Sequence, residues 1–347
     1  MKRYDPVVLR RSFLSLTPAL LARSPLEALG EQFTQLTSQH GVAQAVLHLR
    51  MGTTVREFVA GAAKVDTVFL LASITKPMTA VAVMKLVDRG EVRLSDPVKR
   101  YLPQFATGDR ARVTVQQLLT HTSGLPDMLP ENDDLRRRHA PLRDFVAGAV
   151  KTPLLFQPGS ECRYQSMGIL LAAEIVERLT KRPLRDFLAR ELFAPLGMKA
   201  TSLGLGGREL AKTAASQVTA DPDWNWNSQY WRDLGAPWGG ALAPAGDVAK
   251  FLSAFLTPTR ILKPESARAM VTNQNAGLNK PYGIGFAVSG LGSGCSPKAF
   301  GHGGSTGTAC WADPARDAVF VLVTTKPAAE SGKPVIQPLS DAASRIA

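Results

Sequence analysis

Apolar residues recur along the chain with two different spacings, which predict helices and strands in separate regions. Residues 25–41 have helical spacing and end at a glycine, whereas 42–50 and 54–63 alternate like strands on either side of a turn. A second helical pattern starts near residue 73 and ends near Gly90. The first 90 residues therefore predict a helix, a hairpin and then a buried helix.

The middle of the chain, residues 92–235, contains mainly helical patterns separated by loops. A short helix is expected after Thr114, whose hydroxyl suits a helix N-cap, and an amphipathic pattern over 168–182 stops at Pro183. Helical spacing resumes over 184–198. This region predicts helices rather than a sheet.

The last third of the chain returns to strand-like patterns. Helices are expected over 246–256, with Asp247 as cap, and over 336–347. Three strands, bounded by turns rich in glycine or containing Asp-Pro, are predicted at 282–290, 307–314 and 318–326.

Strands near both ends of the chain, with helices between them, predict an α+β fold. A central antiparallel sheet would be flanked by helices, and an all-helical domain would be inserted into it. We assign residues 1–92 and 236–347 to the sheet domain and 93–235 to the mainly helical domain, with the functional site between the two.

The composition is that of an ordinary globular protein, with 347 residues of which 45% are hydrophobic and 20% charged. The net charge is +12, but long Lys/Arg runs are absent and 133–140 mixes both signs. This favours a solvated basic surface and argues against a nucleic-acid partner. No apolar run approaches the roughly 18 residues of a membrane span, which argues against membrane insertion. Three cysteines without a Cys-x-x-Cys pair indicate neither a disulfide framework nor a zinc ribbon.

The N-terminal segment leaves localisation open. Arg10-Arg11 precedes a short apolar stretch, as in a twin-arginine export signal. Pro18 lies within that stretch, Arg23 follows it, and there is no clear small-residue cleavage site. A cytoplasmic protein with an N-terminal helix lying on the fold is slightly favoured over an exported one.

A serine and a lysine stand three residues apart where a strand-like run meets a helix. Residues at i and i+3 share one face of a helix, so the Lys76 amine can reach the Ser73 hydroxyl. Burial lowers the pKa of a lysine, and a neutral amine can activate a neighbouring hydroxyl as a nucleophile. Taken alone, the pair is more typical of a helix cap followed by a surface lysine, because it is expected about once by chance in a chain of this length.

Two other stretches add candidate chemistry. Tyr164 stands in a polar loop before a helix and can relay a proton if cations lower its pKa; the alternative is a packed aromatic residue. The glycine-rich run 301–307 can turn backbone amides toward an oxyanion, although such a run also suits a turn. It matches Gly-x-Ser-x-Gly around Ser305, but no histidine follows Ser305, which excludes a nucleophile elbow.

In this order and spacing, the motifs resemble those of the penicillin-recognising serine hydrolases. The resemblance is to the class C β-lactamase-like branch, which also holds D-alanyl-D-alanine peptidases and carboxylesterases. It runs from about residue 25 to residue 330 and includes the stretches LLTHTSGLPD and GGALAPAGDVAKFL. It implies a β-lactamase/transpeptidase-like fold and an active site between two domains, with no metal or cofactor.

The resemblance also implies roles for individual residues. Ser73 would be the acylated nucleophile, Lys76 its base, and Tyr164 the group that shares protons with Lys76 and protonates the leaving group. The backbone amides of Ser73 and Ser305 would form the oxyanion hole. Substrate-binding positions would be His302, Gly303, Gly304, Ser166 and Met128.

Three of these positions depart from the pattern of the branch. Ser166 replaces the usual asparagine of Tyr-x-Asn, Met128 stands where lactamase members carry a glutamine, and His302 replaces the lysine of Lys-Thr-Gly. A histidine is mostly neutral at pH 7, so it holds a substrate carboxylate poorly. These departures favour a small or moderately apolar ester over a lactam or peptide.

The expected function is that of a serine carboxylesterase, with a small-molecule ester or amide as substrate. A β-lactamase or D-alanyl-D-alanine carboxypeptidase is the alternative, and the basic charge would suit cell-wall polymers. A catalytically idle binding protein on the same fold is a third alternative, disfavoured because Ser73, Lys76 and Tyr164 are all present. The sequence leaves the oligomeric state and the acyl group open.

Overall fold

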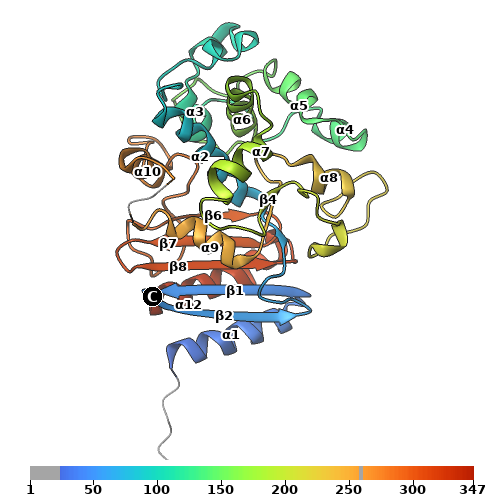
Figure 1. Ribbon diagram of the computed structural model, residues 1–347, viewed down its shortest axis with the longest axis vertical. Helices are drawn as coiled ribbons and strands as arrows, with labels where there is room; N and C mark the ends of the chain where they lie inside the picture. Colours follow the sequence, from blue (N-terminus) through green and yellow to red (C-terminus); the bar gives the residue numbers. More distant parts are fainter. Residues whose placement is uncertain (1–23, 258–260) are drawn as a thin grey trace, which may run out of the picture.

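A five-stranded antiparallel sheet forms the centre of the computed structural model, which describes residues 24–257 and 261–347 (Figure 1). Its strand order is β2-β1-β8-β7-β6, so the first hairpin pairs with the last strand. Both ends of the described chain therefore build one sheet, and the predicted α+β fold is confirmed. The strands are β1 (Gln44–Met51), β2 (Thr54–Gly61), β6 (Phe300–Gly304), β7 (Thr308–Asp313) and β8 (Ala318–Thr324).

Helices cover both faces of this sheet (Figure 1). On one face, α1 (Pro25–Gln39) and α12 (Gln337–Ile346) pack together over a small core that includes Phe33 and Leu339. On the other face, α9 (Ala245–Ser253) packs against β1, β7 and β8. Side chains of a strand alternate between faces, and β8 is buried on both, which explains its unbroken apolar sequence.

The helical region lies beyond the sheet edge formed by β6 (Figure 1). Its helices surround α2, and one hydrophobic core includes residues of α2, α6, α9 and the inner face of the sheet. Because this core is continuous, the division into domains at 93–235 stays a proposal. No helix in the described ranges is long and apolar enough to cross a membrane. The helices are α2 (Thr75–Asp88), α3 (Val115–Leu119), α4 (Asn132–Arg137), α5 (Leu142–Ala149), α6 (Met167–Thr180), α7 (Leu184–Leu188), α8 (Gln229–Leu234), α10 (Pro264–Val271) and α11 (Ala328–Ser331).

Several helix and strand predictions are confirmed, including the first hairpin and the cap at Thr114. The Thr114 hydroxyl accepts a hydrogen bond from the Gln117 backbone amide, and the Gln117 side chain accepts one from the Thr114 backbone amide. The two bonds form a capping box. The pattern over 184–198 is only partly helical, because α7 ends at Leu188 and a π-helical turn follows over Ala189–Phe193. The possible export signal at Arg10-Arg11 lies outside the described residues.

Two local predictions are wrong. The segment 282–290 is not a strand, because only Ala287 bridges to the sheet, at Gly301. Gly285 has a φ of +81° and a Cβ there would lie 2.6 Å from the Ala80 side chain, so the chain bends closely over α2 instead. Asp247 does not cap α9; its carboxylate lies in the first turn and accepts hydrogen bonds from a distant loop at 200–201.

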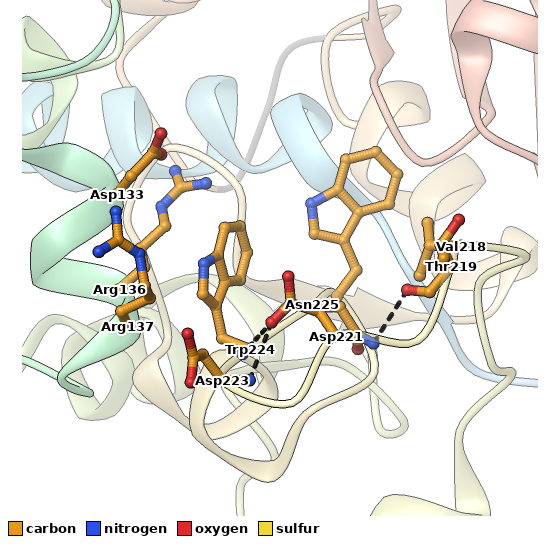
Figure 2. Close-up of a pocket in the computed structure, with 10 residues that line it drawn as sticks. Asp133, Arg136, Arg137, Val218, Thr219, Asp221, Asp223, Trp224 and Asn225 are labelled. Atoms are coloured by element: carbon orange, nitrogen blue, oxygen red, sulfur yellow. Dashed lines mark hydrogen bonds between the residues drawn. The ribbon is translucent and has the colours of Figure 1, made fainter.

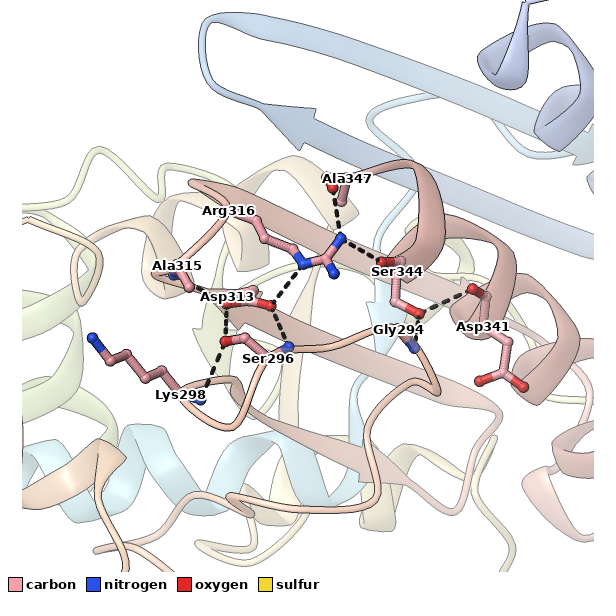
Figure 3. Close-up of polar contacts among 9 residues, drawn as sticks. All are labelled: Gly294, Ser296, Lys298, Asp313, Ala315, Arg316, Asp341, Ser344 and Ala347. Atoms are coloured by element: carbon pink, nitrogen blue, oxygen red, sulfur yellow. Dashed lines mark hydrogen bonds and ion pairs between the residues drawn. The ribbon is translucent and has the colours of Figure 1, made fainter.

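A buried carboxylate holds the turn between β7 and β8 (Figure 3). Asp313 accepts hydrogen bonds from the Ser296 backbone amide and hydroxyl and from the Ala315 amide. Arg316 lies 3.7 Å from this carboxylate and donates to two backbone carbonyls at the end of α12. The cluster thereby joins the sheet, the preceding loop and the last helix.

Replacing Asp313 with asparagine should lower the free energy of unfolding by about 1–3 kcal/mol, because an amide nitrogen would face buried donors. Urea unfolding monitored by circular dichroism measures this change. The matched control is Asp317→Asn in the same turn, whose carboxylate is 60% exposed and pairs with Arg50. The control should lose less than about 1 kcal/mol. Equal losses in both variants would contradict the role given to Asp313.

Candidate active site

The backbone before α2 is held in a conformation that presents Ser73. Ser73 lies in a 3₁₀ turn (Ala72–Ile74) that precedes α2, and not in the first turn of α2 as expected. Ala72 has a φ of +47°, in the left-handed region that costs a non-glycine residue roughly 1 kcal/mol or more. Thr75 fixes this turn, because its hydroxyl donates to the Ala72 carbonyl and accepts from the Ala241 amide. Ala241 belongs to β5 (Ala241–Ala243), the middle strand of a small sheet with β3 (Phe69–Leu70) and β4 (Ser202–Leu203).

Lys76 is a buried amine in contact with this serine. It is 1% exposed, and its Nζ lies 3.0 Å from Ser73 Oγ and 3.1 Å from the Trp238 carbonyl oxygen. Burial lowers the pKa of Lys76 to about 7, although the Asp127 carboxylate acts in the opposite direction. A substantial part of the amine is therefore neutral at physiological pH and can accept the proton of Ser73.

Tyr164 completes a cluster of three reactive side chains. Its ring centroid lies 4.6 Å from Lys76 Nζ, and it lines the same two cavities as Ser73. Burial raises the pKa of Tyr164, the Ser73 side chain lowers it, and the Asp127 charge raises it further. The net shift is upward, so the condition stated for Tyr164, a pKa lowered by cations, is not met. The phenol keeps its proton at neutral pH and can donate it.

The hairpin of β6 and β7 approaches Ser73 through a glycine and two threonines. A Cβ at Gly304 would lie 2.4 Å from the Leu71 carbonyl oxygen, so only glycine permits this approach. The Thr306 hydroxyl donates to Leu70 at 2.7 Å and the Thr308 hydroxyl to Leu71 at 2.8 Å. These contacts hold the strand beside the 3₁₀ turn, and Ser305 lines the same cavities as Ser73.

His302 is a neutral side chain with both ring nitrogens engaged. Its Nδ1 lies 2.7 Å from the Gly303 carbonyl oxygen, which can only accept, so Nδ1 carries the hydrogen. Its Nε2 therefore accepts from the Tyr282 hydroxyl at 2.8 Å. Burial, and secondarily the Lys76 charge, lowers the pKa of His302 to about 3. This side chain presents no positive charge to a substrate.

Two cavities open onto Ser73 and Tyr164. The smaller, of about 290 Å³, is lined by Ser166 and Met128; the larger, of about 430 Å³, extends along β6 past His302, Gly303 and Gly304. The structure thus brings all the predicted site residues together, with Lys76 reaching Ser73 from the protein interior.

The smaller cavity also contains residues that the sequence analysis missed. Asp127 accepts a hydrogen bond from the Ser166 hydroxyl at 2.6 Å and influences the pKa of Lys76. Arg136 and three tryptophans line the rest of the wall. The sequence did contain one sign of this aromatic wall, because four of the five tryptophans lie between residues 224 and 238. The three that line this cavity are Trp226, Trp231 and Trp238.

Comparisons with known proteins agree with this geometry. The family model described as Beta-lactamase matches residues 29–340. Esterase EstB of Burkholderia gladioli is 37% identical over 172 residues, which span 45% of this chain and 42% of the esterase. Penicillin-binding protein 4 of Amycolatopsis lactamdurans is 31% identical over 307 residues, 80% of this chain and 78% of that protein.

A solved structure is similar over nearly the whole chain. EstCE1, described as a hydrolase with promiscuous acyltransferase activity, superposes with a TM-score of 0.77 at 20% identity, covering 93% of this chain and 99% of EstCE1. At this identity the likeness concerns the fold alone. The family match over residues 29–340 decides the assignment: the chain belongs to the Beta-lactamase family and is a class C β-lactamase-like serine hydrolase.

Proposed function

We propose that the protein is a carboxylesterase that forms an acyl-enzyme on Ser73. The single observation that carries this proposal is the 3.0 Å contact between Ser73 Oγ and the amine of Lys76, whose pKa is about 7. A nucleophile beside a base with a pKa near the working pH is what general-base activation requires.

In the acylation step, Lys76 Nζ takes the hydroxyl proton while Ser73 Oγ attacks the ester carbonyl carbon. The resulting oxyanion is stabilised by the backbone amides of Ser73 and Ser305, which flank the cavities. The carbon–oxygen bond to the alcohol then breaks. Tyr164 donates its phenolic proton to the departing alkoxide and is reprotonated by the Lys76 ammonium, so the base is neutral again.

In the deacylation step, a water molecule takes the place of the alcohol. The neutral base accepts a proton from the water through Tyr164 or directly, and the hydroxide attacks the acyl carbon. The bond from the acyl carbon to Ser73 Oγ then breaks, and Oγ takes a proton from the pair formed by Lys76 and Tyr164. Charge and protons balance over the cycle, and no further group is needed.

The polar groups around Ser73 support an ester over a lactam or peptide. Ser166 donates its hydroxyl hydrogen to Asp127. The Gln165 side chain accepts a hydrogen bond from the Ser123 hydroxyl and donates one to the Gln117 carbonyl oxygen. His302 is neutral and fully hydrogen-bonded. Few groups therefore remain to recognise an amide or to hold a carboxylate beside β6, whereas an ester with a good leaving group depends less on such contacts.

The proposal is tested with p-nitrophenyl esters of increasing chain length and a chromogenic cephalosporin. We expect turnover of the esters, little turnover of the cephalosporin, and an acyl adduct on Ser73 by mass spectrometry. Absence of ester turnover together with rapid cephalosporin hydrolysis would sink the esterase assignment.

The pH dependence of ester hydrolysis should follow the protonation of the Lys76 amine. Since the neutral form of Lys76 is the active base, kcat/KM should rise as the pH increases through about 7 and then level off. The Asp127 carboxylate raises this pKa, so Asp127→Asn should move the rising limb toward lower pH. Asp134→Asn, at a carboxylate that is 69% exposed, is the control and should leave the profile in place. A shift of the Asp127→Asn profile to higher pH would contradict this assignment.

Ser305 should tolerate removal of its hydroxyl, because its proposed contribution is a backbone amide. We expect Ser305→Ala to retain kcat/KM within about threefold of the wild-type value, since the amide that faces the oxyanion is unchanged. Steady-state kinetics with p-nitrophenyl butyrate measures this. A loss of several orders of magnitude would instead favour Ser305 as a nucleophile.

A β-lactamase or D-alanyl-D-alanine carboxypeptidase is the second candidate. The observation that favours it is the match to Penicillin-binding protein 4, which spans 80% of this chain. Efficient cephalosporin turnover, or release of D-alanine from a peptide ending in D-alanyl-D-alanine, would support this function over the esterase.

A further inference from the structure

Arg136 is a buried cation without an anionic partner among residues 24–257 and 261–347. It lies on α4, is 8% exposed, and has no carboxylate oxygen within 4.0 Å of its nitrogens. One Nη donates to the Met128 sulfur at 3.4 Å, whereas Nε has no hydrogen-bond partner. Burial lowers the pKa of Arg136 to about 10, even though the Asp133, Tyr230 and Asp127 charges oppose this. A desolvated charge without a partner is costly, so this guanidinium has unused binding capacity.

A second buried arginine shows what a purely structural role looks like in this protein. Arg232 is 1% exposed and also lacks a carboxylate partner, but its Nε and both Nη atoms donate to oxygens. These contacts fix the loop that carries Trp226. Arg136 differs because, within the described ranges, the one hydrogen bond of its side chain goes to a sulfur atom and its Nε has no partner.

Arg136 forms part of the wall between two cavities. It lines the 290 Å³ cavity that reaches Ser73, and also an outer cavity of about 570 Å³. Figure 2 shows Arg136 and Asp133 projecting from α4 beside Trp224. The guanidinium carbon lies 4.5 Å from the ring centroid of Trp224 and 4.6 Å from that of Trp231. The two indoles lie against the guanidinium, and Nε is closed to solvent, so a ligand would reach the group through its terminal Nη atoms.

We infer that Arg136 binds a carboxylate at the far end of the acyl group, so that the preferred substrates are half-esters of dicarboxylic acids. The inference rests on the proposed esterase function. A planar guanidinium edge matches a carboxylate through two parallel hydrogen bonds, and the pair neutralises the buried charge.

The arrangement of the cavities assigns the carboxylate to the acyl side. The acyl group stays bonded to Ser73 after the alcohol leaves, and the smaller cavity links Ser73 to Arg136. The larger cavity along β6 is then left for the alcohol. Asp127 borders the smaller cavity, but its carboxylate accepts a hydrogen bond from Ser166, and both it and Asp133 lie beyond ion-pair distance from Arg136.

The test compares two esters with the same p-nitrophenyl leaving group, the monoester of glutaric acid and the uncharged 5-methylhexanoate. Arg136→Met removes the charge and keeps an unbranched stem. We expect the ratio of kcat/KM for the charged ester to that for the neutral ester to fall by about 10- to 100-fold. Arg136→Lys keeps the charge but not the planar edge, so its ratio should lie between those of Arg136→Met and the wild-type protein. The rate with the neutral ester serves as the check of folding.

The matched control is Arg137→Met, which removes the same charge from an exposed position on α4. This variant should keep the wild-type ratio within about twofold, because exposed charges are screened. A 4-carboxyphenyl ester of butyric acid places the charge on the alcohol instead, and Arg136→Met should leave the ratio of its kcat/KM to that of phenyl butyrate within about twofold. An unchanged ratio in Arg136→Met, an equal fall in Arg137→Met, or equal sensitivity of the alcohol-charged ester would overturn the inference.

An inhibition measurement keeps the inference testable if Arg136→Met does not fold. Glutarate should inhibit hydrolysis of the neutral ester by the wild-type protein more strongly than its uncharged analogue glutaramide, and the difference should shrink in Arg136→Lys. Equal inhibition by both would overturn the carboxylate site. Failure of the wild-type protein to hydrolyse either ester would instead reject the esterase proposal itself.

Discussion

Replacing Ser73 with alanine should lower ester turnover by about 10⁴-fold or more, because no acyl-enzyme can form. Ser73 Oγ is the hydroxyl that contacts the buried Lys76 amine, and Tyr164 lines the same cavities. Steady-state kinetics gives the loss in rate, and mass spectrometry should show that the adduct found in the wild-type protein is missing.

The informative comparison for Ser73→Ala is Ser305→Ala. Both serines line the same two cavities, so a nonspecific effect of removing a hydroxyl would appear in both variants. Only the Ser73 variant should be inactive. Residual turnover near the wild-type level in Ser73→Ala would remove the basis of every enzymatic role proposed for this site.

Replacing Lys76 with methionine should reduce kcat/KM by about 10³-fold or more, because nucleophile and base act as one unit. Methionine keeps much of the buried volume, so the 1% exposed site stays filled and the loss reports the missing amine. The residual activity should also lose its rise through pH 7. A pH-rate profile and a thermal unfolding curve, measured on the same preparation, separate chemistry from stability.

Lys85→Met is the control for this variant. Lys85 lies on the same helix, α2, but is only partly buried and borders neither cavity at Ser73. Activity should stay within about threefold of the wild-type value, as expected of a position outside the reacting groups. A small effect of Lys76→Met, or an equal effect of Lys85→Met, would argue against the amine as the base.

Local patterns predicted the sheet and most helices well, and failed where a distant contact decides the local conformation. The hairpin of β1 and β2 follows from alternation and a short turn. Asp247 was read as a helix cap because it starts an apolar run, but its carboxylate is used by a loop at 200–201. Likewise, Gly285 bends a strand-like segment because α2 lies against it.

The reactive residues of the candidate site were predictable because they occur in short motifs. Arg136 carries no such signal, since an arginine in a mixed-charge segment is indistinguishable from a surface residue. Asp127 ends the stretch LLTHTSGLPD, but its contact with Ser166 depends on the fold. The ring contacts of Arg136 come from the tryptophan-rich loop and helix at 224–238, which folds against α4 from almost 100 residues away. The direction of the Tyr164 pKa shift was missed for the same reason, because burial depends on the whole fold.

The position of β8 between β1 and β7 has a consequence for how the protein is made. The backbone amide of Gln44 bonds the side chain of Thr325, a separation of 281 residues along the chain. During synthesis, β1 therefore waits with an open edge until the chain 281 residues further on has left the ribosome. Nascent chains that stall before β8 should be the species that aggregate and require chaperones.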